Sequence, residues 1–228
     1  MKIGFFGGSF DPPHRGHIAL ARLAIERLGL DRVLFAPVGR QPLKRDRPQA
    51  GFADRVAMTE LAIAGETHME ISTLDGPRAD GRPNYTIDVI AALRVVLAHD
   101  DQIFCLMGAD SFLTIGRWHH SVDLLLACDM VVGARPGFPI ADLTAALPAE
   151  VSIGACDQPQ PSDQVLCLRA AGQPATHLYL LPDLAEDVSA SEIRAALQRG
   201  ADEATVLSPP VAAYIREHRL YREDTADR

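Results

Sequence analysis

The feature that most constrains this chain is a stretch rich in glycine and histidine near the N-terminus, residues 7–17, with the sequence GGSFDPPHRGH. A short apolar run, residues 3–6, precedes it, and an amphipathic run, residues 18–28, follows it. This order predicts a strand, a glycine turn and a helix. Adjacent glycines allow a ligand to approach the backbone closely, and the N-terminus of a helix offers free N–H groups that suit phosphate. The stretch therefore predicts an anion-binding turn.

Two histidines of this stretch are spaced to contact such an anion. His14 and His17 are three residues apart, so they would share one face of the first helical turn. Metal binding and plain packing are the alternatives. Zinc proteases place two histidines at i and i+4 beside a glutamate, which is missing here, and Asp11 is the nearest third ligand. We therefore favour contact with phosphate and predict no metal site on the protein.

The stretch differs from two familiar phosphate-binding loops. The chain has no G-x-x-x-x-G-K-[ST] sequence, and no G-x-G-x-x-G sequence stands at the first turn. Instead, the stretch resembles the x-F-D-P-x-H-x-G-H element of the nucleotidyltransferase superfamily related to the class I aminoacyl-tRNA synthetases. The resemblance implies an ATP site that includes Gly7, Gly8, Ser9, Phe10 and His17.

Charge and composition restrict the class of partner. With 30 acidic and 22 basic residues the net charge is −8, and no basic run could neutralise a nucleic-acid backbone. We therefore expect a small anionic substrate that meets a local cationic cluster, and no nucleic-acid partner. The apolar fraction of 47% is that of an ordinary globular protein. No apolar run approaches about 18 residues, so we expect no membrane partner.

The cysteines and the N-terminal segment favour a cytoplasmic protein. Cys105, Cys128, Cys156 and Cys167 form no C-x-x-C pair, and we expect free thiols, which favour a reducing compartment. The first predicted strand starts at residue 2, without the charged and apolar segments of a signal peptide. The sequence leaves open whether the protein forms a homo-oligomer.

Apolar strands alternate with amphipathic helices along most of the chain. Predicted strands cover residues 2–6, 32–37, 69–72, 102–107, 129–134 and 178–181, and predicted helices include 52–64, 85–98, 191–199 and 209–217. The alternation predicts an α/β fold with a doubly wound, mainly parallel sheet. We expect one domain over residues 1–221, closed by a small C-terminal helical part, and a frayed tail at 222–228. Residues 138–176 are interpreted as a variable insertion with short hairpin strands at 151–153 and 165–168.

A second candidate anion site lies near the C-terminus, in the sequence DVSASEIR of residues 187–194. Ser189 or Ser191 would cap a helix whose N-terminus faces an anion. One turn later, Arg194 would add a guanidinium group, which can make two parallel hydrogen bonds to an anion. An ordinary capping box between Ser189 and Glu192 is the alternative. The segment resembles the I-S-S-T-x-I-R element of the same superfamily, with Ser191 in place of the usual threonine. This resemblance favours a triphosphate site.

Lys44 lies in a polar loop, residues 39–51, after the second predicted strand. Open α/β sheets bind ligands at the carboxyl ends of their strands, so Lys44 could reach a pyrophosphate together with Arg40 and Arg45. A solvated loop lysine is the alternative. The superfamily resemblance implies the phosphate-binding role, because related proteins carry a lysine or similar base in this loop.

Three further segments resemble the bacterial nicotinate-nucleotide adenylyltransferases. They are NYTID at 84–88, GADS at 108–111 followed by Trp118, and the final helical segment at 209–221. With the two phosphate motifs, the resemblance covers most of residues 1–137 and 178–221 and implies a Rossmann-like nucleotidyltransferase fold. It implies that Trp118 stacks on a pyridine ring, and that Thr86, with Tyr85, binds the nicotinate carboxylate. From the residues alone, a core position for Trp118 and a helix-start role for Thr86 are equally acceptable.

The same resemblance gives roles to three other residues. Asp110 would bind ribose hydroxyls, Gly108 would allow adenosine to approach, and Arg135 would lie near the nicotinate mononucleotide, with a surface loop position as its alternative. Helix-capping preferences lead us to expect Asn84 as the N-cap of the helix at 85–98 and Asp110 or Ser111 as the cap of the short helix that ends at residue 115.

The reaction that the resemblance implies is adenylyl transfer from ATP to nicotinate mononucleotide, giving nicotinate adenine dinucleotide and pyrophosphate in NAD biosynthesis. His14, His17, Lys44 and Arg194 would hold the phosphates, and Mg²⁺ would bridge phosphate oxygens. The alternatives are an adenylyltransferase acting on nicotinamide mononucleotide or phosphopantetheine, or a non-catalytic nucleotide sensor. A full set of phosphate cations speaks against the sensor, because binding alone would not require it.

Overall fold

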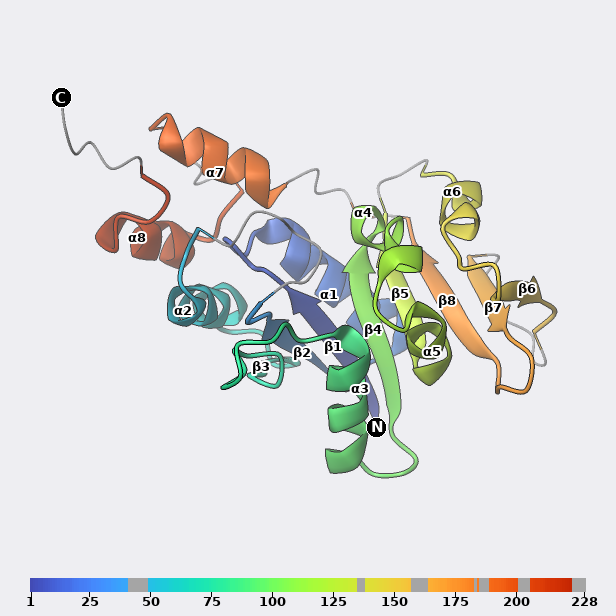
Figure 1. Cartoon of the computed structure of the whole chain (residues 1–228). Helices are drawn as coiled ribbons and strands as arrows, with labels where there is room; N and C mark the ends of the chain where they lie inside the picture. Colours follow the sequence, from blue (N-terminus) through green and yellow to red (C-terminus); the bar gives the residue numbers. More distant parts are fainter. Residues whose placement is uncertain are drawn as a thin grey trace.

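The computed structural model describes residues 1–40, 49–134, 138–156, 164–182, 184, 189–200 and 206–222. Its centre is an eight-stranded sheet with the order β3-β2-β1-β4-β5-β8-β7-β6 (Figure 1). The strands are β1 Lys2–Gly8, β2 Arg32–Pro37, β3 Met69–Ile71, β4 Gln102–Gly108, β5 Asp129–Gly133, β6 Ser152–Gly154, β7 Val165–Arg169 and β8 Thr176–Leu181. The helices are α1 Arg15–Leu28, α2 Phe52–Ile63, α3 Thr86–Val96, α4 Ala109–Phe112, the 3₁₀ helix Ile115–Arg117, α5 Ser121–Ala127, α6 Ile140–Ala145, α7 Ala190–Gln198 and α8 Pro209–Glu217.

Strand order shows where this sheet can bind a ligand. Neighbouring strands in the series β3-β2-β1-β4-β5-β8 pair in parallel. In this series, β1 lies between β2 and β4. Phe5 of β1 pairs with Cys105 of β4, and from there both strands run to a terminal glycine, Gly8 and Gly108. The order of the strands reverses at this pair, which is where doubly wound sheets bind ligands. The predicted α/β, doubly wound and mainly parallel fold is confirmed.

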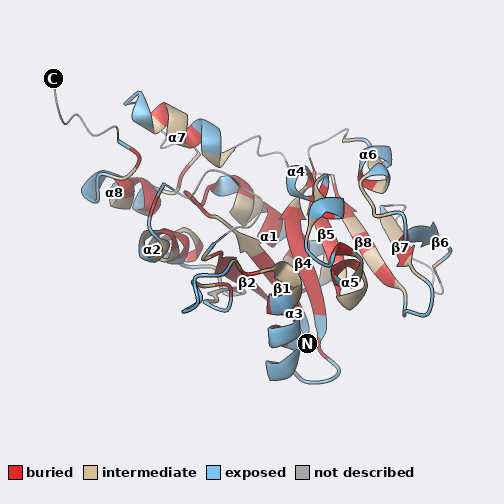
Figure 2. Ribbon diagram, in the orientation of Figure 1, coloured by how far each residue is buried: buried red, intermediate tan, exposed pale blue. Residues whose placement is uncertain are grey.

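The sheet is buried on both faces, as a doubly wound fold requires. Side chains alternate along each strand, so Phe5 joins the core under α3 and α5, whereas Phe6 joins the core under α1. Figure 2 shows the buried residues concentrated on the central strands and exposed residues along α3 and β6. This two-sided burial explains why the central strands are almost continuously apolar.

The C-terminal helices form a third core with α2. Met58 of α2, Ile193 of α7 and Val211 of α8 are buried in one cluster, and the Tyr214 hydroxyl donates a hydrogen bond to Asp54 Oδ1 at 3.0 Å. In Figure 1, α2, α7 and α8 gather at the end of the molecule opposite β6 and β7. The C-terminal part of the chain thus packs beside the early strands.

Residues 138–176, interpreted above as an insertion, extend the sheet beyond β8. After α6 the chain forms β6 and β7, which pair antiparallel, and β7 also pairs antiparallel with β8. The hairpin strands expected at 151–153 and 165–168 are therefore present, each displaced or lengthened by one residue. The variability of this segment among relatives, and the single-domain boundary at residue 221, stay predictions.

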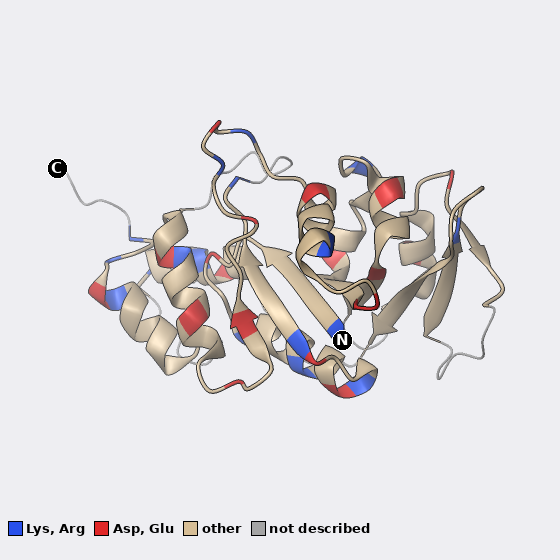
Figure 3. Ribbon diagram, turned by 90° about the horizontal axis from the view of Figure 1, so that it is seen from below, with Lys and Arg blue, Asp and Glu red and all other residues tan. Residues whose placement is uncertain are grey.

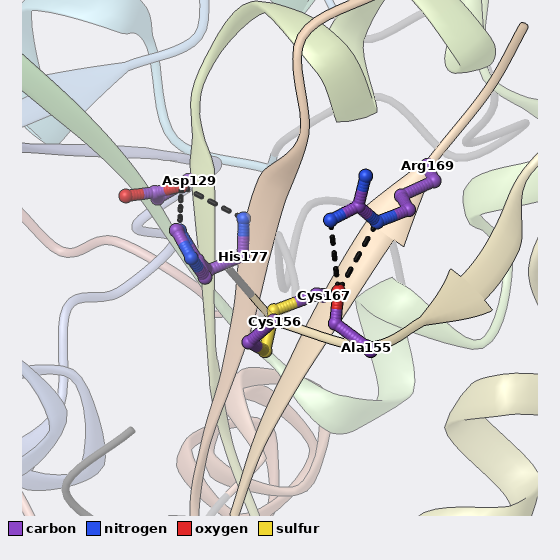
Figure 4. Close-up of a disulfide and its surroundings, with 6 residues drawn as sticks. All are labelled: Asp129, Ala155, Cys156, Cys167, Arg169 and His177. Atoms are coloured by element: carbon purple, nitrogen blue, oxygen red, sulfur yellow. Dashed lines mark hydrogen bonds and ion pairs between the residues drawn. A yellow bond between two sulfur atoms is a disulfide. The ribbon is translucent and has the colours of Figure 1, made fainter. Parts of the chain in front are cut away.

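The expectation of free thiols is wrong for one pair of cysteines. Cys156 and Cys167 form a disulfide with their Cα atoms 5.4 Å apart (Figure 4). The physical reason is the hairpin: Gly154 pairs with Cys167, so a cysteine two residues after Gly154 is brought next to Cys167 although 11 positions separate the two in sequence. Arg169 reinforces the same turn by donating from Nη2 to the Ala155 carbonyl at 2.8 Å. Cys105 and Cys128 are free and buried, as expected.

The disulfide can be tested by counting thiols. Purified protein unfolded in guanidinium without reductant should expose two titratable thiols, those of Cys105 and Cys128, and four after reduction. Because the bond closes a short loop, reduction should lower the free energy of unfolding by about 3 kcal/mol in urea titrations. A Cys156→Ser variant, which cannot form the bond, should be insensitive to reductant. Four thiols in the unreduced wild-type protein would show that the pair is not bonded.

Candidate active site

The first structural component of the site is the turn between β1 and α1. Phe10, which is not a glycine, has a φ of 47° and is buried against Phe6 and Phe35, with ring centroids 5.5 Å away in both cases. A Cβ on Gly8 would come within 3.2 Å of the Phe10 ring, so a side chain at this position would crowd the ring. The Asp11–Pro12 peptide is cis. The buried aromatic ring anchors a backbone turn that leaves Gly7, Gly8 and Ser9 partly exposed.

His14 and His17 meet at the start of α1, as their spacing predicted. Their ring centroids lie 3.7 Å apart, and the His14 backbone N–H donates to His17 Nδ1 at 3.1 Å. His17 Nδ1 is therefore an acceptor, which leaves the proton of the neutral ring on Nε2. Burial lowers the pKa of His14 to about 4, so this imidazole is neutral at pH 7. The pair offers neutral N–H donors at a helix N-terminus rather than two permanent cations.

Arg194 brings the second motif to the first. Its Nη1 donates to the Asp11 carbonyl at 2.7 Å and lies 3.7 Å from Asp11 Oδ2, across 183 positions of sequence. Its Nη2 donates to Ser191 Oγ at 3.1 Å, while Ser189 Oγ accepts the Glu192 N–H at 3.2 Å and caps α7. The capping role and the cationic role, which the sequence left as alternatives, are both compatible with this structure. The two candidate phosphate motifs are therefore in direct contact.

Arg55 of α2 is a structural residue of the site that sequence reasoning missed. Only 1% of its surface is exposed, and its two Nη atoms donate to the Ser9 carbonyl at 2.7 Å and the Val38 carbonyl at 2.8 Å. Burial lowers the pKa of Arg55, although Asp11 and Asp75 favour its charged form. The available signal was periodicity, because Arg55 lies in phase with the buried positions Met58 and Thr59. This guanidinium ties the turn after β1 to the end of β2.

The residues expected to bind a pyridine ring are also brought together. Thr86 is the first residue of α3, and Tyr85 precedes it as the N-cap. The Tyr85 ring lies 4.0 Å from the ring of His119, the residue next to Trp118. Trp118 is half-buried and donates its indole N–H to Thr114 Oγ1 at 3.0 Å. His119 was not expected to take part, since nothing in its local pattern distinguishes it from a surface histidine.

Two capping predictions are wrong. Asn84 does not cap α3, because its amide instead donates to the Gly76 carbonyl at 2.6 Å and holds the preceding loop. Similarly, α4 has Gly108 as its N-cap, so neither Asp110 nor Ser111 occupies that position. Asp110 is exposed within α4, directly after the carboxyl end of β4. It therefore stays available to a ligand at the reversal of strand order.

Three candidate residues, Lys44, Arg45 and Arg135, lie outside the described residues. Within the described ranges, no group of three or more His, Cys, Asp or Glu side chains is arranged to hold a metal ion. In that same part of the chain, no helix combines the length and apolar character needed to cross a membrane. Figure 3 shows acidic and basic residues interspersed over one face of the molecule.

Comparison with known proteins identifies the class. The cytidylyltransferase-like family matches residues 5–196, which include both phosphate motifs. Among solved structures, the fold is similar to that of a Plasmodium falciparum nicotinic acid mononucleotide adenylyltransferase complexed with NaAD, with a TM-score of 0.70 at 17% identity, covering 96% of this chain and 97% of that one. The chain is a nucleotidyltransferase of the cytidylyltransferase-like family.

Relatives found by sequence define the family of the chain more closely. It is 36% identical to the "Probable nicotinate-nucleotide adenylyltransferase" of Pelobacter propionicus, over 98% of this chain and 99% of that protein. It is 38% identical to the protein of the same name from Laribacter hongkongensis, over 99% and 96%. The chain therefore belongs to the nicotinate-nucleotide adenylyltransferases, which confirms the family resemblance of its motifs.

The buried His14 predicts a specific dependence of stability on pH. The unfolded chain binds a proton at His14 below its usual pKa of 6.5, whereas the folded chain binds it only near pH 4. The contribution of neutral His14 to the free energy of unfolding is therefore fully present above pH 6.5. It is lost as the pH falls towards 4, which lowers the free energy of unfolding by at most about 3 kcal/mol. Urea unfolding at pH 7.5 and pH 4.5 should show a larger loss for the wild type than for His14→Gln. Equal losses in the two proteins would contradict the burial of a neutral His14.

Proposed function

We propose that the site transfers the adenylyl group of ATP to nicotinate mononucleotide with the residues described above in the following roles. The observation that carries the proposal is the contact of Arg194 with Asp11, which joins the C-terminal cation to the motif that contains the His14–His17 pair. This contact supports a single triphosphate site at the point where the strand order reverses. A cytoplasmic location stays a prediction from the sequence, which left the oligomeric state open.

ATP is proposed to lie along the turn after β1. The backbone of Gly7 and Gly8 would approach the phosphates, and the N-terminus of α1 with His17 would donate to them. Arg194 would act from the opposite side, helped by the capped N-terminus of α7. Additional proposed ATP contacts are Ser9, Phe10, His14, Gly108, Asp110, Ser189 and Ser191. Lys44 would complete the phosphate contacts from the loop after β2.

The acceptor is proposed to bind between the start of α3 and Trp118. A pyridine ring matches the flat indole, and a pyridinium charge would strengthen the contact. The carboxylate of the acceptor would meet the free N–H groups at the start of α3, next to Tyr85 and Thr86. The Tyr85–His119 ring contact supports this pocket because it joins the two segments. Arg135 would lie nearby.

The chemistry needs positioning and charge stabilisation more than proton transfer. The phosphate of nicotinate mononucleotide is already an anionic nucleophile, so it would attack the α-phosphorus of ATP directly. A new P–O bond forms, the bond to the β-phosphate oxygen breaks, and pyrophosphate leaves. Neutral imidazoles at His14 and His17 would donate hydrogen bonds to phosphate oxygens, and Arg194 would stabilise charge on the leaving group. Mg²⁺, bound to ATP oxygens and water, would neutralise further phosphate charge.

The proposed activity is tested by Mg²⁺-dependent release of pyrophosphate from ATP. Nicotinate mononucleotide, nicotinamide mononucleotide and phosphopantetheine would be compared as acceptors. We expect the first to give a kcat/KM at least about 100-fold above the others, because an amide or a pantetheine cannot satisfy donors arranged for a carboxylate. Release with nicotinamide mononucleotide only would overturn the carboxylate preference, and release with phosphopantetheine only would keep the adenylyl transfer and overturn the pyridine pocket. If no acceptor leads to pyrophosphate release, the result would favour a nucleotide sensor.

The role of the histidine pair is tested by His17→Ala. Removing a donor aimed at the phosphates should lower kcat by about 100-fold or more, with only a small change in melting temperature. His99→Ala is the control, because His99 is fully exposed and its ring contacts the equally exposed Asp100 at 3.3 Å. The control should keep wild-type kcat. A folded His17→Ala protein with near-full activity would show that the motif is not a phosphate site.

A further inference from the structure

The buried carboxylate of Asp11 connects distant parts of the site. Only 3% of Asp11 is exposed, and both of its carboxylate oxygens accept hydrogen bonds. Oδ2 accepts the Gln49 N–H at 2.9 Å, and Oδ1 accepts the Ala50 N–H at 3.1 Å. Oδ1 also accepts the hydroxyl of Tyr221 at 2.7 Å. A single side chain of the first motif therefore holds the segment entering α2 and the last described turn of the chain.

Tyr221 reaches Asp11 across 210 positions of sequence. To bring it there, the chain after α8 adopts left-handed backbone at Arg219 and Tyr221, with φ of 53° and 63°. Such backbone is costly for residues other than glycine, so the surrounding contacts must impose it. The Tyr221 ring is buried with Met58 and Val211 in the cluster shared by α2, α7 and α8. The strained turn and the apolar packing together aim one hydroxyl at one carboxylate.

The hydroxyl remains a donor at any physiological pH. Burial, supported by the neighbouring Asp11 carboxylate, raises the pKa of Tyr221 well above its ordinary value. A protonated phenol beside an ionised carboxylate makes a charge-assisted hydrogen bond, which is stronger than a neutral one. The contact is therefore suited to fixing the orientation of Asp11 permanently.

The same Asp11 supports the proposed phosphate cation. Arg194 contacts Asp11 through both its carbonyl and its carboxylate. If the Asp11 carboxylate rotates, the Arg194 guanidinium loses its contact with Oδ2, one of the groups that fix its orientation. Tyr221 contacts Asp11 directly, and we expect its effect on Arg194 to pass through this carboxylate.

We propose that Tyr221 is a positioning residue for adenylyl transfer: its hydroxyl orients the Asp11 carboxylate, and this carboxylate holds Arg194 in the geometry that stabilises the leaving pyrophosphate. The role rests on the proposed function of the site. It differs from a purely structural role because it concerns the transition state, where the leaving group gains charge.

Tyr214 provides a matched control for this role. It lies in α8, and its hydroxyl also donates to a carboxylate, Asp54 Oδ1, at 3.0 Å. The Tyr214 contact likewise joins the C-terminal helices to α2, but it does not involve Asp11. Tyr221→Phe and Tyr214→Phe each remove one hydrogen bond between a phenol and a carboxylate from the same part of the fold, the first buried and the second partly buried, and each keeps the aromatic ring.

We expect Tyr221→Phe to lower kcat about tenfold while KM for ATP and for nicotinate mononucleotide stays within about twofold. Tyr214→Phe should keep kcat within about twofold of the wild type. Melting temperatures of the two variants report any shared loss of stability. Equal kcat values for the two variants would overturn the role of Tyr221. A wild-type enzyme that is inactive with every acceptor would overturn the proposed function and this role together, so the two failures are distinguishable.

A double-mutant cycle tests whether Tyr221 acts through Arg194. Arg194→Lys keeps the positive charge but removes the fork that Asp11 directs. In that background, Tyr221→Phe should lower kcat by less than about twofold, because the oriented group is already gone. A further tenfold loss would show that Tyr221 acts independently of Arg194 and would overturn the proposed route.

Discussion

The candidate site depends on one buried cation, the guanidinium of Arg55. A charge this deep is costly unless it is hydrogen-bonded, and Arg55 donates to two carbonyls, those of Ser9 and Val38. These carbonyls follow β1 and β2, which are neighbours in the sheet, and β1 borders the point where the strand order reverses. The same turn is also held by the Phe10 ring, by the hydrogen bond from the Val38 N–H to the Gly8 carbonyl at 2.9 Å, and by the contacts of Asp11. Arg55 therefore fixes the position of the turn after β1 relative to β2, and the proposed phosphate contacts of that turn depend on this position.

Charge at the site is distributed differently from charge over the whole chain. The protein carries a net charge of −8, yet the phosphate motifs place Arg194 and two imidazoles together. Burial keeps His14 neutral, and the Asp11 carboxylate is enclosed by three hydrogen-bond donors and Arg194. The negative charge of Asp11 is thus compensated within the motif by these donors and by Arg194. An acidic protein can bind a triphosphate in this way because local orientation outweighs net charge at short range.

Sequence periodicity predicted much of the fold, because a parallel strand buried on both faces is apolar throughout and short polar turns mark its ends. The spacing of His14 and His17 likewise predicted their contact, since three residues in a helix bring side chains to one face. Contacts between distant segments were not predictable in this way. Arg55 and Asn84 bind backbone carbonyls of other loops, and the partner of Cys156 depends on an antiparallel hairpin. His119 becomes informative only when Tyr85 is placed against it.

The site unites segments that lie far apart in the chain. Asp11 precedes strands β2 to β5, and Tyr221 follows all of them by a long stretch of sequence. The sheet from β1 to β5 can pair before the segment after α8 has been synthesised, but the carboxylate of Asp11 gains its phenol partner only after residue 221 has been added. A product terminated before this residue would keep the glycine turn yet lack the hydrogen bond. Assembly of the site is thereby delayed until the segment after α8 has left the ribosome.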